Sequence, residues 1–197
     1  LSNDEEIGCL GAPRLIEQLM ADEPRPAAVI VGEPTLMAPV VAHKGITNLR
    51  TTVTGQAAHS SQVYQGVSAI HVAARLVTRI EDIMEELKAE GRIDEAFNVA
   101  HSSLHVGRIQ GGTAINIKAR DCHFDWEIRH LPSDSFEALY ARFDAYAREL
   151  EAEMQVRSPG TGIVTEHITQ TVPALAARIS VSIFMDSRMI TTSPSAT

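Results

Sequence analysis

The sequence predicts two kinds of fold in one chain. Residues 1–40 are expected to form a piece of an α/β domain, and residues 41–173 an α+β domain of the split βαβ type (ferredoxin-like, β-α-β-β-α-β). The first prediction rests on a helical apolar stripe followed by a short, wholly apolar run. The second rests on two long amphipathic stretches that alternate with strand-like segments in the order this fold requires.

The first 40 residues carry one helix and one strand. A helix is predicted over residues 8–21, where apolar side chains recur at helical spacing, and Pro24 ends it. Residues 27–31 are all apolar, which is typical of a buried parallel strand. The run ends in a loop that contains Glu33, a position where open α/β sheets place their ligands. Alternatively, Glu33 is a turn residue that precedes a proline.

Residues 42–172 supply the second domain. Strands are predicted over 42–54, 104–109, 115–128 and 163–172, with helices over 67–90 and from Asp134 to Met154. The predicted stripe of the first helix is Ile70, Ala74, Val77, Ile80, Met84 and Leu87. Asp134 and Glu137 are expected to cap the second helix. Residues 174–197 are rich in Ser, Thr and Pro, and we expect them to be a divergent or truncated tail.

Composition excludes several classes of function. The chain has 197 residues, a net charge of −8 and 5% aromatic residues, so it lacks the basic and stacking residues of a nucleic-acid binder. No apolar run reaches the ~20 residues that span a bilayer, and we expect no membrane partner. The two cysteines, Cys9 and Cys122, form neither a metal-type pair nor a disulfide framework, which favours the cytoplasm.

Charged residues near the start are the first candidates for catalysis. In Asp4-Glu5-Glu6, side chains of adjacent residues point in different directions, so one carboxylate can bind a metal while its neighbour moves a proton. The alternative is a solvated acidic turn.

Polar residues of the second domain are further candidates. His59 lies among small residues after a strand and could donate to a developing oxyanion, or be an ordinary surface residue. Asn116 could orient a carbonyl group and Arg129 could bind a carboxylate. Alternatively, Asn116 forms a turn and Arg129 is a surface charge.

The order of these motifs is more specific than any one of them. The chain reads SNDEEIG (2–8), VGEPT (31–35), HKG (43–45), GQAAHSS (55–61), GGTAIN (111–116) and DWEIR (125–129). Over about residues 1–175 this succession resembles the M20 family of metallopeptidases and deacylases. The resemblance implies an α/β catalytic domain with a two-metal centre, usually zinc and possibly cobalt, and an inserted lid domain that makes a homodimer. After Asn116 the chain reads Ile117-Lys118-Ala119, a turn in which many relatives have a proline.

The resemblance also implies roles for the acidic residues. Glu5 would be the general base and proton shuttle, and Glu6 and Glu33 would each bind one metal. The family's other ligands, an upstream His and Asp and a late His, have no counterpart among the eight histidines of this chain. We therefore expect a piece of a longer enzyme that is inactive alone.

For the lid, the resemblance implies that His59 reaches the active site of the partner subunit and stabilises the oxyanion. Asn116 and Arg129 would hold the carbonyl and the α-carboxylate of an N-acyl amino acid. The implied reaction converts N2-acetylornithine to ornithine and acetate in arginine biosynthesis. Alternatives are another deacylase of the family, which removes succinyl from diaminopimelate or acyl groups from other amino acids, a non-catalytic dimerisation module, and a regulatory amino-acid-binding module.

Overall fold

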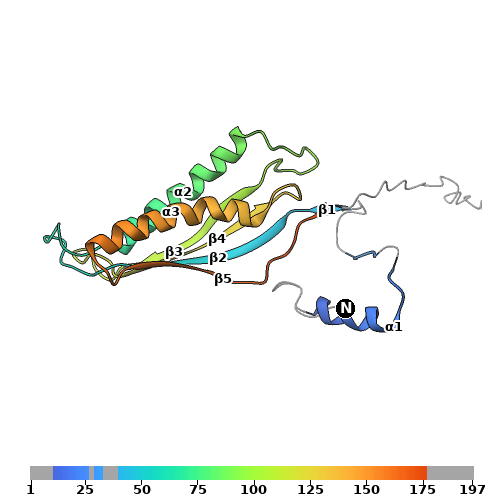
Figure 1. Ribbon diagram of the computed structural model, residues 1–197, viewed down its shortest axis with the longest axis horizontal. Helices are drawn as coiled ribbons and strands as arrows, with labels where there is room; N and C mark the ends of the chain where they lie inside the picture. The colour runs from blue at the N-terminus through green and yellow to red at the C-terminus, as the bar shows by residue number, and fades with distance from the viewer. Residues whose placement is uncertain (1–10, 27–28, 33–39, 177–197) are drawn as a thin grey trace, which may run out of the picture.

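The computed structural model describes residues 11–26, 29–32 and 40–176. A four-stranded antiparallel sheet, in the order β3-β4-β2-β5, carries two long helices on one face (Figure 1). The strands are β2 (Gly45–Thr54), β3 (Ser103–Gly111), β4 (Asp121–His130) and β5 (Gly162–His167), and the helices are α2 (Ala69–Ala89) and α3 (Phe136–Arg157). With this element order, the split βαβ prediction is confirmed.

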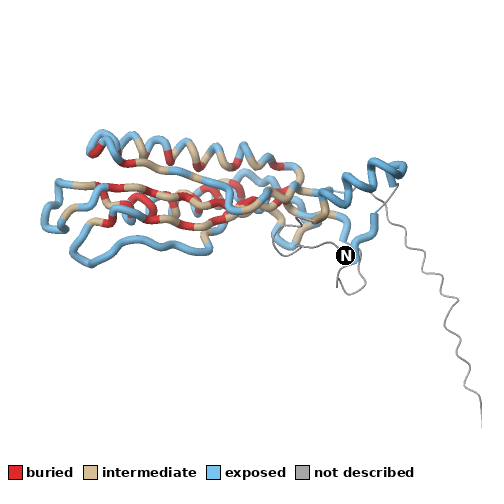
Figure 2. The backbone as a smooth tube through the Cα atoms, turned by 90° about the horizontal axis from the view of Figure 1, so that it is seen from below, coloured by how far each residue is buried: buried red, intermediate tan, exposed pale blue. Residues whose placement is uncertain are grey.

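Strand β2 lies at the centre and shows why this sequence forms a half-covered sheet. Its residues alternate between buried and half-buried along the whole strand, with Leu49, Thr51 and Val53 inside. It pairs with β4 from Gly45↔His130 to Thr54↔Asp121, and with β5 on its other side. The alternation turns one side of the strand toward the helices and the other toward the open face, and Figure 2 shows buried positions recurring along the sheet and the helices.

Strand β4 begins later than the sequence predicted. Residues 115–120 form a turn before Asp121, and Gly112 has a φ of +81°, which glycine adopts without strain. From there the residues alternate between buried and less buried along most of the strand, and Cys122, Phe124, Trp126 and Ile128 are buried.

Helix α2 buries a different stripe from the predicted one. The buried residues are Ala69, Val72, Ala73, Leu76, Ile80, Ile83 and Leu87, so only Ile80 and Leu87 of the predicted stripe are buried. Ile70, in the first turn of the helix, is 39% exposed. The helix carries apolar residues around much of its circumference, so periodicity alone did not select the buried side.

Helix α3 begins one residue later than its predicted cap. Ser135 is the N-cap and its Oγ accepts a hydrogen bond from the backbone N–H of Ala138, as such residues commonly do. Asp134 instead is buried and accepts a hydrogen bond from the Ser102 hydroxyl. The predicted capping pair of Asp134 and Glu137 is therefore wrong, because the Asp134 carboxylate is hydrogen-bonded to Ser102 and does not cap the helix.

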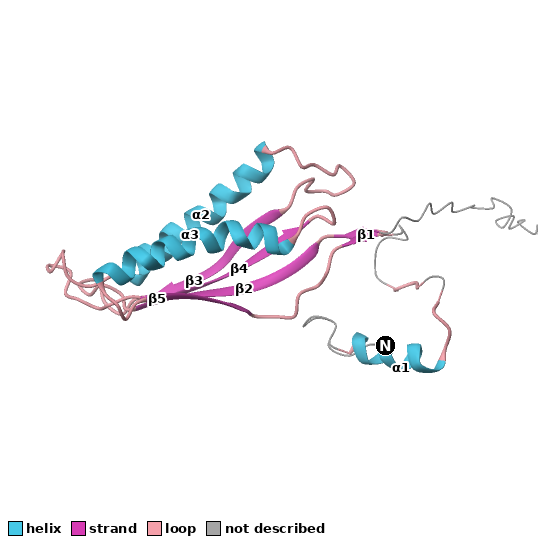
Figure 3. Cartoon of the chain, in the orientation of Figure 1, coloured by secondary structure: helices cyan, strands magenta, loops and turns pink. Residues whose placement is uncertain are grey.

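The last predicted strand is divided. Strand β5 ends at His167, and after a turn the short strand β6 (Leu175–Ala176) pairs with β1 (Ala42–His43). Figure 3 shows these short strands where the chain enters and leaves the domain. Residues 177–197 of the predicted tail lie outside the described residues.

The α/β part predicted for residues 1–40 is not evident in the part the structure describes. Helix α1 (Ala12–Asp22) forms within the predicted helix but has no buried residue. Residues 29–32 form no strand, and Val29, Ile30 and Val31 are 75%, 95% and 73% exposed, so the predicted buried strand is wrong for these residues. A parallel strand takes its hydrogen bonds and burial from neighbouring strands, and no described segment pairs with this one. None of the described helices is long and apolar enough to cross a membrane.

Candidate functional site

The loop that carries His59 is bound to the turn that carries Asn116. Both lie at the end of the sheet where β2 stops and β4 starts. The backbone N–H of Ser60 donates to the Asn116 carbonyl oxygen at 2.9 Å, and Lys118 N–H donates to the Ala58 carbonyl oxygen at 2.8 Å. A β-bridge joins His59 to Ile117 between these bonds. The structure therefore brings together two predicted site segments that are far apart in the sequence.

The His59 ring is exposed, and one of its nitrogens is engaged within the loop. Nδ1 lies 2.7 Å from the Ser61 hydroxyl oxygen and accepts the backbone N–H of Ser61 at 3.2 Å. No described residue bonds to Nε2, which leaves that atom available to a ligand. Ser61 was not singled out from the sequence, although the short His-Ser-Ser spacing is the signal that could have revealed it.

Lys118 fixes the remainder of the His59 loop. Its ammonium group donates to the carbonyl oxygens of Val63, at 2.9 Å, and Gln65, at 2.6 Å. These bonds join the turn before β4 to the loop after β2. The sequence marked the turn that contains this residue only as a departure from relatives.

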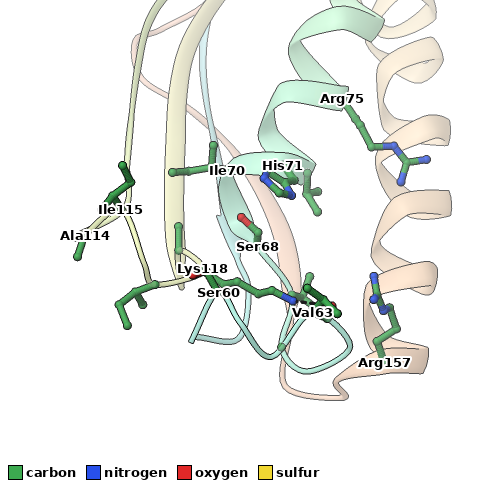
Figure 4. A pocket seen from close by; sticks show the side chains of 15 residues that line it. Ser60, Val63, Ser68, Ile70, His71, Arg75, Ala114, Ile115, Lys118 and Arg157 are labelled. Carbon is green, nitrogen blue, oxygen red and sulfur yellow. Dashed lines mark hydrogen bonds between the residues drawn. The ribbon is translucent and has the colours of Figure 1, made fainter. Parts of the chain in front are cut away.

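A pocket of about 610 Å³ lies beside the two segments, between them and the adjoining ends of α2 and α3 (Figure 4). Its lining includes four basic or titratable side chains, His71, Arg75, Lys118 and Arg157, and no carboxylate. Arg75 is neutralised in part by Glu153, which lies 2.8 Å away on α3. Neither the His59 nor the Asn116 side chain is among the lining residues.

Arg129 lies at the other end of the sheet. It stands next to the last residue of β4, opposite Ile46 of β2 and Ser103 of β3. From Asp121 to Arg129 the strand rises about 26 Å, at ~3.3 Å per residue. The structure therefore does not bring Arg129 near His59 and Asn116 within one subunit.

The guanidinium of Arg129 is held by a neighbour on its own strand. Its Nε lies 2.7 Å from a Glu127 carboxylate oxygen, and this hydrogen bond raises the pKa of Arg129. Lys44 lies nearby, and burial, followed by the charge of Arg129, lowers the pKa of its ammonium group. Its Nζ donates to the His101 carbonyl oxygen at 2.5 Å. Two cationic side chains therefore lie at this end of the sheet, and each has a partner of its own.

Gly45 shows how tightly this end of the sheet is packed. A Cβ atom placed at Gly45 would overlap the imidazole of His130, the residue that faces it across the sheet. Only glycine leaves room for that buried ring. The motif HKG therefore has a packing role in this structure.

The open face of the sheet carries a charged row. Arg50 and Arg108 both contact the carboxylate of Asp125, Arg50 through Nε at 2.7 Å and Arg108 through Nη2 at 2.7 Å. The hydrogen bond from Arg50, helped by both positive charges, lowers the pKa of Asp125.

The described residues do not form a metal centre of their own. Among them, no group of three or more His, Cys, Asp or Glu side chains could hold a metal ion. Glu5, Glu6 and Glu33, the predicted base and ligands, lie outside the described residues, and those predictions stay predictions.

Comparisons with known proteins agree with this architecture. The M20 model of the peptidase dimerisation domain matches residues 41–155. The chain is 34% identical over 183 residues to an acetylornithine deacetylase of Myxococcus xanthus, a match covering 89% of this chain and 47% of that protein. It is 34% identical over 163 residues to the acetylornithine deacetylase of Klebsiella pneumoniae (strain 342), covering 83% and 40%. The chain thus spans less than half the length of these relatives.

Solved structures show the same fold. Aminopeptidase PepT from Bacillus cereus matches with a TM-score of 0.52 and 22% identity, over 73% of this chain and 34% of that one. Aminobenzoyl-glutamate utilization protein from Klebsiella pneumoniae matches with a TM-score of 0.53 and 18% identity, over 68% and 30%. The family match and the sequence relatives confirm the resemblance drawn from the motifs: the chain belongs to the M20 peptidase family, and residues 41–155 are its dimerisation domain.

Proposed function

We propose that this chain is the lid and dimerisation part of a cytoplasmic, metal-dependent amidohydrolase that converts N2-acetylornithine to ornithine and acetate. The relatives named acetylornithine deacetylase support the substrate. The observation that carries the proposal is the backbone pairing of the His59 loop with the Asn116 turn. It presents an exposed imidazole with a free Nε2 beside an exposed carboxamide.

In this proposal His59 and Asn116 act on the acyl carbonyl group. An N–H at Nε2 of His59 can donate to the carbonyl oxygen as negative charge develops there. The carboxamide of Asn116 can orient the same carbonyl. Both groups stand on a loop cluster tied together by backbone hydrogen bonds, so little reorganisation is needed when charge appears.

Arg129 is proposed to bind the α-carboxylate of the substrate through a bidentate pair of hydrogen bonds from its guanidinium group. The separation of about 26 Å along β4 far exceeds the length of an acyl amino acid. One substrate can therefore contact Arg129 and His59 only when the two residues come from different subunits. This distance supports an active site shared across a dimer.

The metals would be zinc, with cobalt as an alternative, bound through Glu6 and Glu33 together with residues that this chain lacks. Glu5 would serve as the general base. A pair of such ions polarises a carbonyl and lowers the pKa of bound water. Because Glu6 and Glu33 are the only ligands of the family's two-metal centre that its motifs identify in this chain, we expect the 197-residue chain by itself to lack deacetylase activity and to bind zinc weakly.

The dimer is proposed to form along β3. This edge strand pairs only with β4, so one row of its backbone groups is open. Ile109 on β3, 51% exposed, and Ile70 on α2, the helix that packs against β3, supply apolar surface. At the other edge, a Glu151 carboxylate oxygen already accepts the Ile163 N–H at 2.9 Å. The β3 edge is therefore the better template for a second copy.

The test compares variants of the complete, metal-loaded deacylase. His59→Ala should lower kcat by about 10²–10³-fold, the range for loss of one oxyanion donor. His123→Ala removes a histidine from the open face of the sheet and should leave kcat unchanged. Assays with acetylated ornithine, acetylated methionine and succinylated diaminopimelate choose among the deacylases of the family. Unchanged turnover in His59→Ala would contradict the proposal. Turnover by the 197-residue chain, abolished by chelation, would contradict the expectation that it is inactive alone.

A further inference from the structure

The ring of His59 is held by a donor that cannot act as an acceptor. The backbone N–H of Ser61 points at Nδ1 at 3.2 Å. A backbone N–H only donates, so Nδ1 must carry its lone pair there. The Ser61 hydroxyl, 2.7 Å from the same nitrogen, then donates as well. In the neutral ring the proton therefore resides on Nε2.

Three other histidines of the chain show the opposite arrangement. The Nδ1 atoms of His43, His101 and His130 each face the carbonyl oxygen of the next residue, at 3.1, 2.8 and 3.1 Å. A carbonyl oxygen only accepts, so these rings carry a proton on Nδ1, and in the neutral form Nε2 has the lone pair. Of these four rings, His59 is thus the one that offers an N–H at Nε2.

We propose that Ser61 is a positioning residue that holds neutral His59 in the Nε2–H form, so that the ring meets its ligand as a donor. The inference rests on the proposed role of His59 as the group that stabilises the acyl oxygen. That oxygen gains negative charge in the transition state and needs an N–H. In the other tautomer the Nε2 lone pair would repel it.

The loop geometry supports this role. Gln62 N–H donates to the His59 carbonyl oxygen at 2.9 Å, which closes a tight turn around Ser61. Both bonds to Nδ1 come from this turn, so the ring direction and its tautomer are set together. Ser61 need not contact the substrate.

Nitrogen-15 NMR of the 197-residue chain, at a pH above the ordinary histidine pKa of ~6.5, tests the proposal directly. His59 should show a pyrrole-like Nε2 and a pyridine-like Nδ1, whereas His101 shows the reverse. His71 is exposed and has no hydrogen bond within the described residues, so it reports the unconstrained mixture. Ser61→Ala keeps the backbone N–H but loses the hydroxyl donor, so it should move His59 part of the way toward the His71 pattern, and Ser61→Thr should restore the Nε2–H form. A pyridine-like Nε2 in His59, or no change in Ser61→Ala, would overturn the proposal.

Kinetics of the complete deacylase separate this inference from the proposed function. Ser61→Ala should lower kcat by about tenfold, less than the ~10²–10³-fold expected when the donor itself is lost, with KM little changed. Ser60→Ala is the matched control, because its side chain has no hydrogen bond within the described residues. A shifted tautomer with unchanged kcat would reject the role of His59 as donor, and with it the proposed function. An unshifted tautomer would reject the role of Ser61 alone.

Discussion

The ammonium group of Lys118 donates to the carbonyl oxygen of Val63 at 2.9 Å, and this bond joins positions 55 residues apart. A second bond from the same group reaches the Gln65 carbonyl oxygen at 2.6 Å. The loop that presents His59 is therefore fixed by a side chain from the turn that presents Asn116.

Lys118→Met should loosen this loop while leaving the sheet intact. We expect a loss of about 1 kcal/mol in the free energy of unfolding, below the ~1.5–3 kcal/mol of hydrogen bonds to charged groups because the site is partly exposed. Amide exchange at residues 59–66 should rise. Lys88→Met removes an exposed pair with Glu85 on α2 and should change neither quantity by much. Equal exchange in both variants would show that Lys118 does not anchor the loop.

Thr51→Val should destabilise the core although it preserves size and β-branching. The Thr51 hydroxyl accepts the indole N–H of Trp126 at 3.0 Å inside the protein. Without that partner a buried donor is left unsatisfied, which costs about 1–3 kcal/mol. Thr52→Val makes the same change on the open face and should cost less than 0.5 kcal/mol. Chemical unfolding followed by Trp126 fluorescence measures the free energy of unfolding of both variants. Equal losses would contradict the stabilising role given to the hydrogen bond between Thr51 and Trp126.

Acid should remove the contribution that the Asp125 carboxylate makes to the stability of the folded protein. Its pKa in the folded protein is lowered from the ordinary 3.8, chiefly by the hydrogen bond from Arg50. The stability it adds is therefore present above the unfolded pKa and is lost as the pH falls through the folded pKa. Asp125→Asn should lower Tm at pH 7, and the difference from the native protein should vanish well below pH 3.8. Asp144→Asn, in an exposed pair on α3, is the control. A difference that persists in acid would mean that packing, not charge, is responsible.

Ile109→Arg should convert the proposed dimer to monomers. The substitution places a charge at the rim of β3, where the second copy would pack. Val164→Arg puts the same charge on the other edge strand, where Val164 is 58% exposed, and should leave the dimer intact. Sedimentation velocity of the 197-residue chain measures whether each variant is a dimer or a monomer. Loss of the dimer in Val164→Arg alone would assign the interface to β5.

The fold of residues 41–173 could be predicted because its pattern is local. Apolar and polar residues alternate along residues 121–130, and apolar residues recur at helical spacing in α3, where Leu139, Phe143, Leu150 and Met154 are buried. The buried side of α2 was predicted wrongly because its apolar residues lie on more than one side of the helix. More than one stripe at helical spacing can therefore be drawn through them. The run at 29–31 was mistaken because burial of a parallel strand depends on neighbours that no described residue supplies.

The amino-acid sequence by itself determined the order of strands and helices, the inward faces of β2 and β4, and the membership of the M20 family. These features depend on periodicity and on motif order, which are written along the chain. Only the tertiary structure decided that the Ser102 hydroxyl donates a hydrogen bond to Asp134 and that Lys118 holds the His59 loop. It also decided that Arg129 lies at the opposite end of the sheet from Asn116. Such relations arise when hydrogen bonds and packing join segments distant in sequence, and no local pattern encodes them.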